Sequence, residues 1–333
     1  MRFAALTAGL VATACAFVRV RALETDQFYA WNRPLEDATR AINENLNAEI
    51  AAALERVNSR SGKAACPCRD AHDAIRDHLY YLIFGLPEMW ASKASLVDRI
   101  PKTDADEELF RRQYLYRETS PFDPIRWMPP SPTIEIRGIR IGTDKLGHFF
   151  SDGAWIEEPY RRALAKGATD EEALRRSLRF SLVTERTILG MGASGVFSLA
   201  DSEANYQGLL FYRGLCNGPD RALVLTPSGW SLKRPFDIGD YVSPEWDESW
   251  QPNIYSPSRW AKVRPVMRRY CGLLQDPEVR RRRAAYAARD HETPTEAIVS
   301  ELVAAGKLPD PRRFTIEAVC AESASEASAG SGR

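Results

Sequence analysis

The stretch GTDKLGHFFSD at 142–152 contains one of only four histidines in the chain, and a carboxylate stands four residues to either side of it. Side chains four residues apart lie on one face of a helix, so Asp144, His148 and Asp152 would point the same way. A histidine held between carboxylates suits proton transfer and metal binding. Asp144 and His148 are therefore candidates for a functional site.

Two later helical patterns also bring polar groups to an apolar face. Glu185 extends the apolar face of its helix, and a carboxylate buried there needs a partner to offset its loss of hydration. On the next pattern, Asp201 and Asn205 are four residues apart and share a face. Successive helices with short connections usually lie next to each other. We therefore expect His148 to meet Glu185 and Asp201 or Asn205 at a junction of three helices.

Such a cluster has two interpretations that need no catalysis. In the first, Lys145 or Arg186 joins the carboxylates in a buried and fully paired network that fixes the register of the helices. In the second, a divalent zinc or manganese ion is bound by the mixed nitrogen and oxygen ligands of His148, Asp144, Glu185 and Asp201. Catalytic zinc sites usually have more than one histidine, so we expect no cofactor and keep the metal as an alternative.

The third interpretation is catalytic, with Glu185 as a general acid whose pKa is raised by apolar neighbours. His148 and Asp144 complete this candidate catalytic set. The run TERTILGMGASGVFS at 184–198 is faintly similar to lytic transglycosylases, in which a glutamate ends a helix before a glycine–serine loop. The serine that usually follows that glutamate is replaced by Arg186 here. On this interpretation the protein cleaves cell-wall glycan.

The tryptophan-rich run EWDESWQP at 245–252 also has two interpretations. Trp246 and Trp250 could stack on sugar rings and, with Asp201 and Asn205, form a ligand-binding surface. Alternatively, the two tryptophans hold an irregular loop against a helical core. We favour the second interpretation.

DKLGHF at 144–149, a glutamate about one helix later, and SLADSEANYQG at 198–208 together resemble a known pattern. This is the D-K-x-x-H-F … E … D-x-x-A-N-x-x-G pattern of VanZ-like proteins and of the related envelope lipoproteins of the YfiM type. The resemblance covers 143–208, about a fifth of the chain. VanZ-like proteins cross the membrane several times, whereas this region has no apolar span, so the chain is more similar to the YfiM type. The resemblance implies a location in the cell envelope and no established chemistry.

Helical periodicity predicts a mainly α fold, with antiparallel and orthogonal helices in a single domain over 23–319. Its core at 143–216 contains the three helices that position the candidate site, and each opens on a capping residue. An irregular segment rich in tryptophan and proline follows at 219–258. The helices are expected at 37–57, 69–87, 104–118, 143–165, 169–189, 198–216, 257–273, 277–290 and 294–305, one short hairpin at 133–141, and a disordered tail at 320–333.

The N-terminus has the layout of a secretory signal peptide, with one arginine, an apolar run from Phe3 to Val18 and a small residue at Ala22. Removal of residues 1–22 would leave no membrane span in the mature chain. Lipidation at Cys15 and an uncleaved anchor are alternatives. Basic and acidic residues number 45 each, so no net charge favours nucleic acid as a partner.

The protein is therefore expected to be exported and to be periplasmic or secreted. Five cysteines would remain after cleavage, and an oxidising compartment favours two disulfides and one thiol, whose pairing the spacing does not give. We expect a cell-envelope protein of unassigned activity with a structural or binding role, and peptidoglycan or other envelope components as partners. A peptidoglycan hydrolase that uses Glu185 and a metal-dependent hydrolase that uses His148 are the alternatives.

Overall fold

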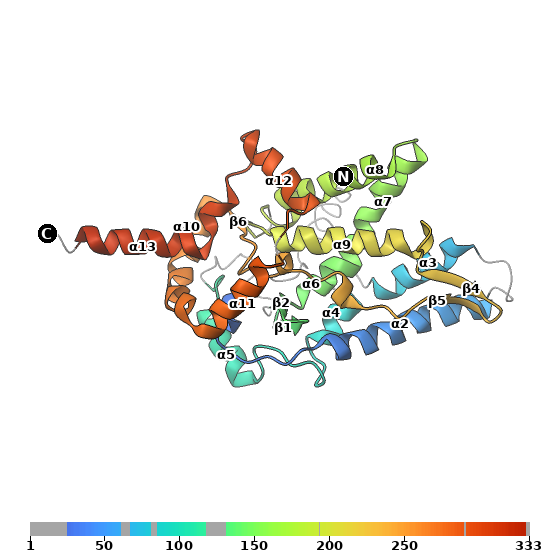
Figure 1. The fold of residues 1–333 in the computed structure, drawn as a ribbon, viewed down its shortest axis with the longest axis horizontal. Coiled ribbons are helices and arrows are strands. Elements are labelled where there is room, and N and C mark those ends of the chain that lie inside the picture. Colours follow the sequence, from blue (N-terminus) through green and yellow to red (C-terminus); the bar gives the residue numbers. More distant parts are fainter. Residues whose placement is uncertain are drawn as a thin grey trace, which may run out of the picture.

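The computed structural model describes residues 25–60, 67–80, 85–117, 131–192, 194–289 and 291–330. Helices dominate this part of the chain, and its strands form two-stranded antiparallel sheets (Figure 1). The mainly α fold predicted from the sequence is confirmed. The predicted signal peptide and the alternative lipidation site lie outside the described residues.

The α-helices are α2 (Thr39–Arg60), α3 (Cys68–Leu79), α4 (Leu86–Ala91), α5 (Asp104–Gln113), α6 (Asp144–Gly147), α7 (Gly153–Ala165), α8 (Asp170–Thr184), α9 (Leu199–Cys216), α10 (Pro257–Met267), α11 (Pro277–Ala287), α12 (Pro294–Ala304) and α13 (Ile316–Gly330). Two π-helical turns, η3 (His148–Asp152) and η4 (Glu185–Leu189), follow α6 and α8. The 3₁₀ segments are η1 (Gln27–Ala30), η5 (Ile238–Asp240), η6 (Pro244–Trp246), η7 (Arg268–Gln275) and η8 (Pro311–Phe314). The strand pairs are β1 (Thr133–Ile136) with β2 (Ile139–Gly142), β3 (Val196–Phe197) with β6 (Ile254–Tyr255), and β4 (Leu223–Thr226) with β5 (Gly229–Leu232).

The helices of the predicted core begin where the capping residues indicate, with one exception. Thr169 and Glu172 form a capping box at the start of α8, and the Ser198 side chain accepts a hydrogen bond from the backbone of Asp201 in α9. Thr143 makes no side-chain cap at α6. Its hydroxyl instead lies 2.9 Å from the Ser92 hydroxyl at the end of α4, so this residue links two helices.

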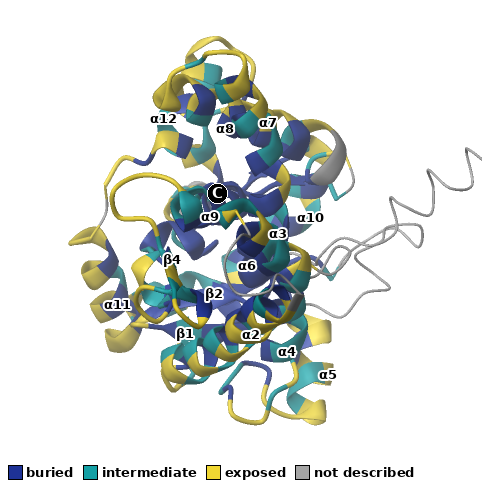
Figure 2. Ribbon diagram, turned by 90° about the vertical axis from the view of Figure 1, so that its right-hand side faces the viewer, coloured by how far each residue is buried: buried dark blue, intermediate teal, exposed yellow. Residues whose placement is uncertain are grey.

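Helix α9 lies in the middle of the molecule and is buried over most of its length (Figures 1 and 2). The core forms two hydrophobic clusters, and α9 contributes residues such as Leu209 to one and Phe211 to the other. Helix α7 packs against both α8 and α9, and the turn η3 packs against α9. The polar residues of α9 are therefore in the interior, where each needs a partner.

Three segments differ from the sequence-based expectation. Helix α3 ends at Leu79, and Gly85 and Pro87 stand at the start of α4 instead of ending the preceding helix. Gly85 adopts a positive φ of 62° just before α4, and proline is well tolerated in a first helical turn. The irregular segment contains the hairpin β4–β5. The tail expected to be disordered from residue 320 is helical to Gly330, since alanine favours helix and a disulfide holds its first turns.

Two disulfides join elements that are distant in sequence. Cys68 at the start of α3 is bonded to Cys216 at the end of α9, and Cys271 in η7 is bonded to Cys320 in α13. Cys15 and Cys66 lie outside the described residues. Within the described ranges, no helix combines the length and the apolar character that a membrane crossing requires.

Candidate functional site

The backbone of the 142–152 stretch touches α9 directly. Gly208 of α9 lies against the carbonyl of Phe149 and against Gly153, and a side chain at either glycine would overlap with the opposite backbone. Asn205 and Asp201 precede Gly208 by about one and two helical turns and share its face of α9. The close approach of the two backbones therefore brings both polar side chains beside the π-helical turn.

Lys145 is the centre of the cluster. Its side chain is fully buried, and its Nζ lies 2.8 Å from Asp144 Oδ2, 2.6 Å from Asp201 Oδ1 and 2.5 Å from Glu248 Oε1. Burial alone would lower the pKa of Lys145, but the three carboxylates outweigh it and raise that pKa well above its ordinary value. Lys145 is therefore a buried ammonium ion shared by three acidic residues.

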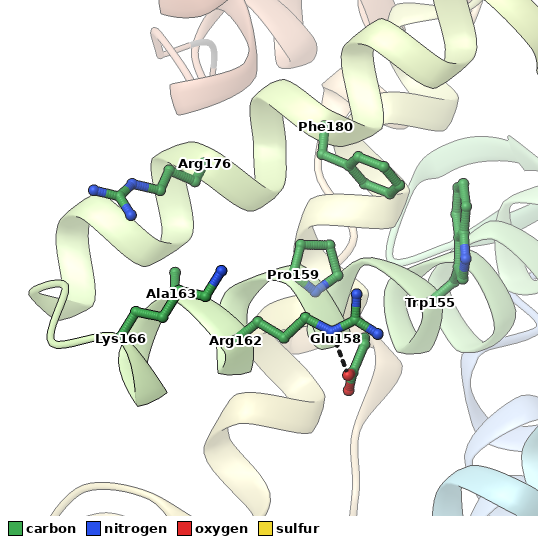
Figure 3. A pocket seen from close by; sticks show the side chains of 8 residues that line it. All are labelled: Trp155, Glu158, Pro159, Arg162, Ala163, Lys166, Arg176 and Phe180. Carbon is green, nitrogen blue, oxygen red and sulfur yellow. Dashed lines mark hydrogen bonds and ion pairs between the residues drawn. The ribbon is translucent and has the colours of Figure 1, made fainter.

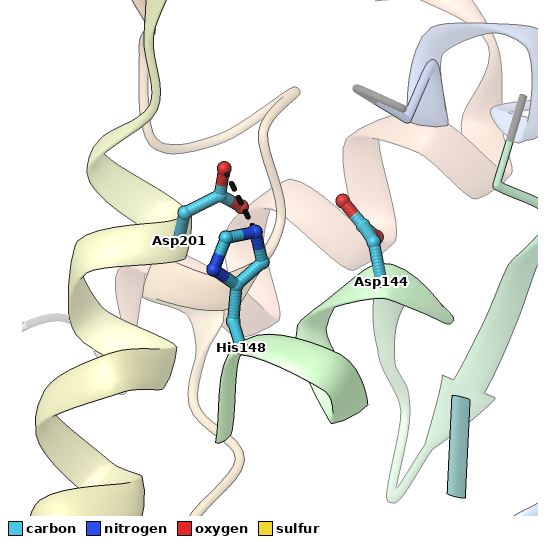
Figure 4. A group of neighbouring side chains, drawn as sticks. All are labelled: Asp144, His148 and Asp201. Atoms are coloured by element: carbon cyan, nitrogen blue, oxygen red, sulfur yellow. Dashed lines mark ion pairs between the residues drawn. The ribbon is translucent and has the colours of Figure 1, made fainter. Parts of the chain in front are cut away.

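His148 is the second cation of the cluster. Its Nδ1 lies 2.9 Å from Asp152 Oδ2 and its Nε2 lies 3.3 Å from Asp201 Oδ2 (Figure 4). Burial alone would lower the pKa of His148, but Asp201 and Asp152 raise it to about 10. His148 and Lys145 in turn lower the pKa of Asp201, against the effect of burial. The imidazole is therefore protonated at neutral pH.

A junction of three helices is present, and α8 contributes Ser181 to it. His148 Nδ1 lies 3.1 Å from the side-chain amide group of Asn205 in α9, and the same amide group lies 3.3 Å from Ser181 Oγ in α8. Polar side chains from η3, α9 and α8 thus form one continuous chain. The contacts of His148 with Asp201 and Asn205 match the sequence-based expectation.

Glu185 does not belong to this group. Among the described residues, Asp144, His148 and Asp201 offer ligand atoms that all lie within 4.8 Å of one another, and Glu185 is not among them. The π-helical turn that begins at Glu185 brings Gly190, five residues later, against the Glu185 carboxylate. The four metal ligands expected from the sequence are therefore reduced to three.

Two acidic residues that sequence reasoning did not assign to the cluster reach it from other segments. Glu248 of the irregular segment contacts Lys145 and accepts a hydrogen bond from Asn253 Nδ2 at 2.8 Å. Burial raises the pKa of Glu248 to about 7, although Lys145 opposes the shift. Glu88 of α4 is 5% exposed, and burial, reinforced by the charge of Asp144, raises its pKa well above the ordinary value. Neither segment has a periodicity that would have indicated these contacts.

The two tryptophans proposed to bind a ligand pack against the protein instead. Trp246 is fully buried, and its ring centroid lies 5.8 Å from that of Phe149. Trp250 makes an edge contact with Tyr286 at 5.7 Å, and the Arg283 guanidinium lies 5.0 Å from its ring. These contacts hold the irregular segment against the helices, as the favoured interpretation predicts.

A surface groove of about 450 Å³ lies between α7 and α8, apart from the buried cluster (Figure 3). Trp155 and Phe180 are 42% and 39% exposed, and their ring centroids are 5.0 Å apart. Three basic residues also line the groove. Arg162 is paired with Glu158 at 2.8 Å, whereas Lys166 and Arg176 form no ion pair within the described part of the chain. The groove therefore combines exposed aromatic rings with positive charge.

Comparison of the chain with known protein families, with curated proteins and with solved structures finds no match.

Proposed function

We propose that the protein is an exported cell-envelope protein with a structural or binding role, and that its buried cluster stabilises the fold rather than performs catalysis. The observation that carries this proposal is the environment of Lys145. Its ammonium group is fully buried and ion-paired with carboxylates from its own helix, from α9 and from the irregular segment. A cation enclosed in this way has no access to a substrate.

Export is supported by the two disulfides. Disulfides persist in oxidising compartments and are rare in the cytosol. The signal-like N-terminus points the same way. Mass spectrometry of the mature protein tests this part, with an N-terminus after Ala22 as the expected result. An N-terminus at Met1 in a cytosolic fraction would contradict it.

For the binding role, the candidate surface is the groove between α7 and α8. Peptidoglycan offers sugar rings, which can stack on exposed aromatic side chains, and carboxylates, which complement basic side chains. Trp155 and Phe180 supply the first kind of contact, and Lys166 and Arg176 supply the second. Exposed apolar patches with charged rims frequently mark binding sites.

Sedimentation with purified peptidoglycan tests this role. The wild-type protein should sediment with the polymer, and Trp155→Ala and Arg176→Ala should each reduce the bound fraction at least about threefold. Leu225→Ala is a matched control, because Leu225 is 50% exposed and does not line the groove. Wild-type protein that stays in the supernatant, or full binding by both groove variants, would contradict the proposal.

A peptidoglycan hydrolase is the second candidate because a π-helical turn begins at Glu185, the general acid expected from the sequence. Such turns occur frequently at functional sites. A zymogram with peptidoglycan separates the two candidates. A cleared band that disappears in Glu185→Gln would favour the hydrolase, whereas no band from folded wild-type protein would favour the binding role.

A further inference from the structure

We propose that Asp144, His148 and Asp201 form a binding site for a divalent transition-metal ion of the zinc or manganese type. This inference goes beyond the structural and binding role proposed above and does not depend on peptidoglycan. It rests on the positions of the donor atoms, on the second hydrogen bond of the histidine and on an unpaired carboxyl group beside the site.

The donor atoms are already close to the spacing that one ion requires. Nitrogen and oxygen ligands lie about 2.0–2.2 Å from zinc, so two ligands on a tetrahedral ion are roughly 3.4 Å apart. His148 Nε2 and Asp201 Oδ2 are 3.3 Å apart. The third donor, from Asp144, lies within 4.8 Å of both. Figure 4 shows the His148 ring paired with Asp201 and the Asp144 carboxylate on the other side of the ring. Lys145, which is not drawn there, contacts both aspartates.

The other nitrogen of His148 has the partner expected of a metal-binding histidine. Such residues almost always donate the second ring N–H to a carboxylate or carbonyl, which fixes the tautomer and the ring orientation. His148 Nδ1 lies 2.9 Å from Asp152 Oδ2. Binding of the ion would replace the Nε2 proton of the imidazolium and leave the other proton at Nδ1, so that the Nε2 lone pair would point toward the ion. This arrangement accounts for a carboxylate on each side of His148 in the sequence.

Acidic groups outnumber the cations around this space. Lys145 and His148 face four deeply buried carboxyl groups, those of Glu88, Asp144, Asp201 and Glu248. Binding of an ion at Nε2 requires the neutral imidazole. The ion would then take the place of the imidazolium as the second positive group beside Asp201, and Lys145 would keep its contacts with Asp144 and Glu248.

A buried carboxyl oxygen of Glu88 is separate evidence that a ligand binds beside this cluster. Its Oε2 is buried and has no hydrogen-bond partner among the described residues. Helix α4 lies along the 142–152 stretch, since Gly85 is close to Gly147 at one end and Ser92 contacts Thr143 at the other. Glu88 lies between these two contacts and on the same helix face. An ion, directly or through a bound water, would satisfy this oxygen.

Metal analysis of the full chain is the first test. Protein purified without chelator should contain about one zinc or manganese ion per chain. After removal of metal, titration calorimetry with Zn²⁺ and with Mn²⁺ should show one saturable site. His148→Ala should weaken binding at least about 100-fold. His291→Ala is the matched control, because His291 is exposed and lies outside the cluster, and its affinity should equal that of the wild type.

Two conservative variants keep the test decisive if His148→Ala does not fold. Asp152→Asn should weaken metal binding by about 10–100-fold while circular dichroism stays unchanged, and Glu88→Gln should weaken it less. A purely structural role of these residues would leave metal affinity unchanged. The proposal is overturned if the folded wild-type protein shows no saturable binding of either ion below about 1 mM, or if His148→Ala or Asp152→Asn binds as tightly as the wild type. Either result leaves the peptidoglycan experiment unaffected.

Discussion

Replacement of Lys145 by methionine is the most direct test of the buried network. Methionine fills much of the lysine volume without its charge, so the loss of packing is small. The change leaves Asp144, Asp201 and Glu248 without the ammonium group that all three contact. Removal of one partner of a buried ion pair destabilises a protein by about 3–5 kcal/mol. We expect a loss of this size in the free energy of unfolding of Lys145→Met at pH 8.

The pH dependence of this loss identifies its cause. Carboxyl groups stranded in the variant have pKa values above those of the unfolded chain. Such groups contribute stability when they are protonated, and this contribution is lost as the pH rises through the folded-state pKa. The difference between wild type and Lys145→Met should therefore be largest at pH 8 and should decrease by roughly half at pH 5.

Urea unfolding followed by circular dichroism, in chelator and at both pH values, measures these differences. Lys102→Met is the control, because Lys102 is 47% exposed and pairs with Asp98 at 2.9 Å on the surface. Exposed ion pairs contribute about 0–1 kcal/mol, so this variant should resemble the wild type. A loss below about 1 kcal/mol for Lys145→Met at pH 8, or a loss that grows at pH 5, would refute the stabilising role of the network.

Three further predictions concern the same fold. Glu248 has a raised pKa of about 7, so its contribution to stability is present at low pH and is lost as the pH rises through 7. Glu248→Gln should therefore flatten the pH dependence of the free energy of urea unfolding between pH 5 and 8 by up to about 3 kcal/mol. The same pH dependence in variant and wild type would contradict this. Cys216→Ser opens a disulfide with a sequence separation of 148, and Cys320→Ser opens one with a separation of 49. Chain entropy predicts that the free energy of unfolding falls by about 5 and 4 kcal/mol, respectively, as measured by chemical unfolding. A larger loss for Cys320→Ser than for Cys216→Ser would contradict this ranking. Gly208→Ala would place a methyl group against the Phe149 carbonyl, so its thermal midpoint should fall by at least about 5 °C, and an unchanged midpoint would show that the two helices can move apart.

The features that local signals encode were predictable from the sequence. The capping box of α8 and the serine cap of α9 are hydrogen bonds between residues three apart, so a short sequence window contains both partners. The contact of His148 with Asp201 and Asn205 also agrees with helical spacing. Asp201 and Asn205 are four residues apart, so both lie on the face of α9 that His148 contacts.

The features that depend on tertiary packing were not predictable in this way. Glu248 reaches Lys145 from a segment without periodicity, and Glu88 reaches the same region from a short helix that begins at a glycine. Glu185 has the spacing expected of a cluster member, but the π-helical turn adds a residue to its turn and places Gly190 beside its carboxylate. A pattern based on 3.6 residues per turn does not anticipate this change.

The order of charges explains how so many ionisable groups are buried together. Asp152, His148, Asp201, Lys145 and Glu248 form a chain in which acidic and basic groups alternate, and each contact joins opposite charges. Each interior member therefore has a partner on both sides, and removal of Asp201 would leave two cations without their shared carboxylate. Members at the ends have one such partner. Substitutions at Asp201 and Lys145 should consequently be strongly non-additive, because the first loss already breaks the contacts that the second would remove.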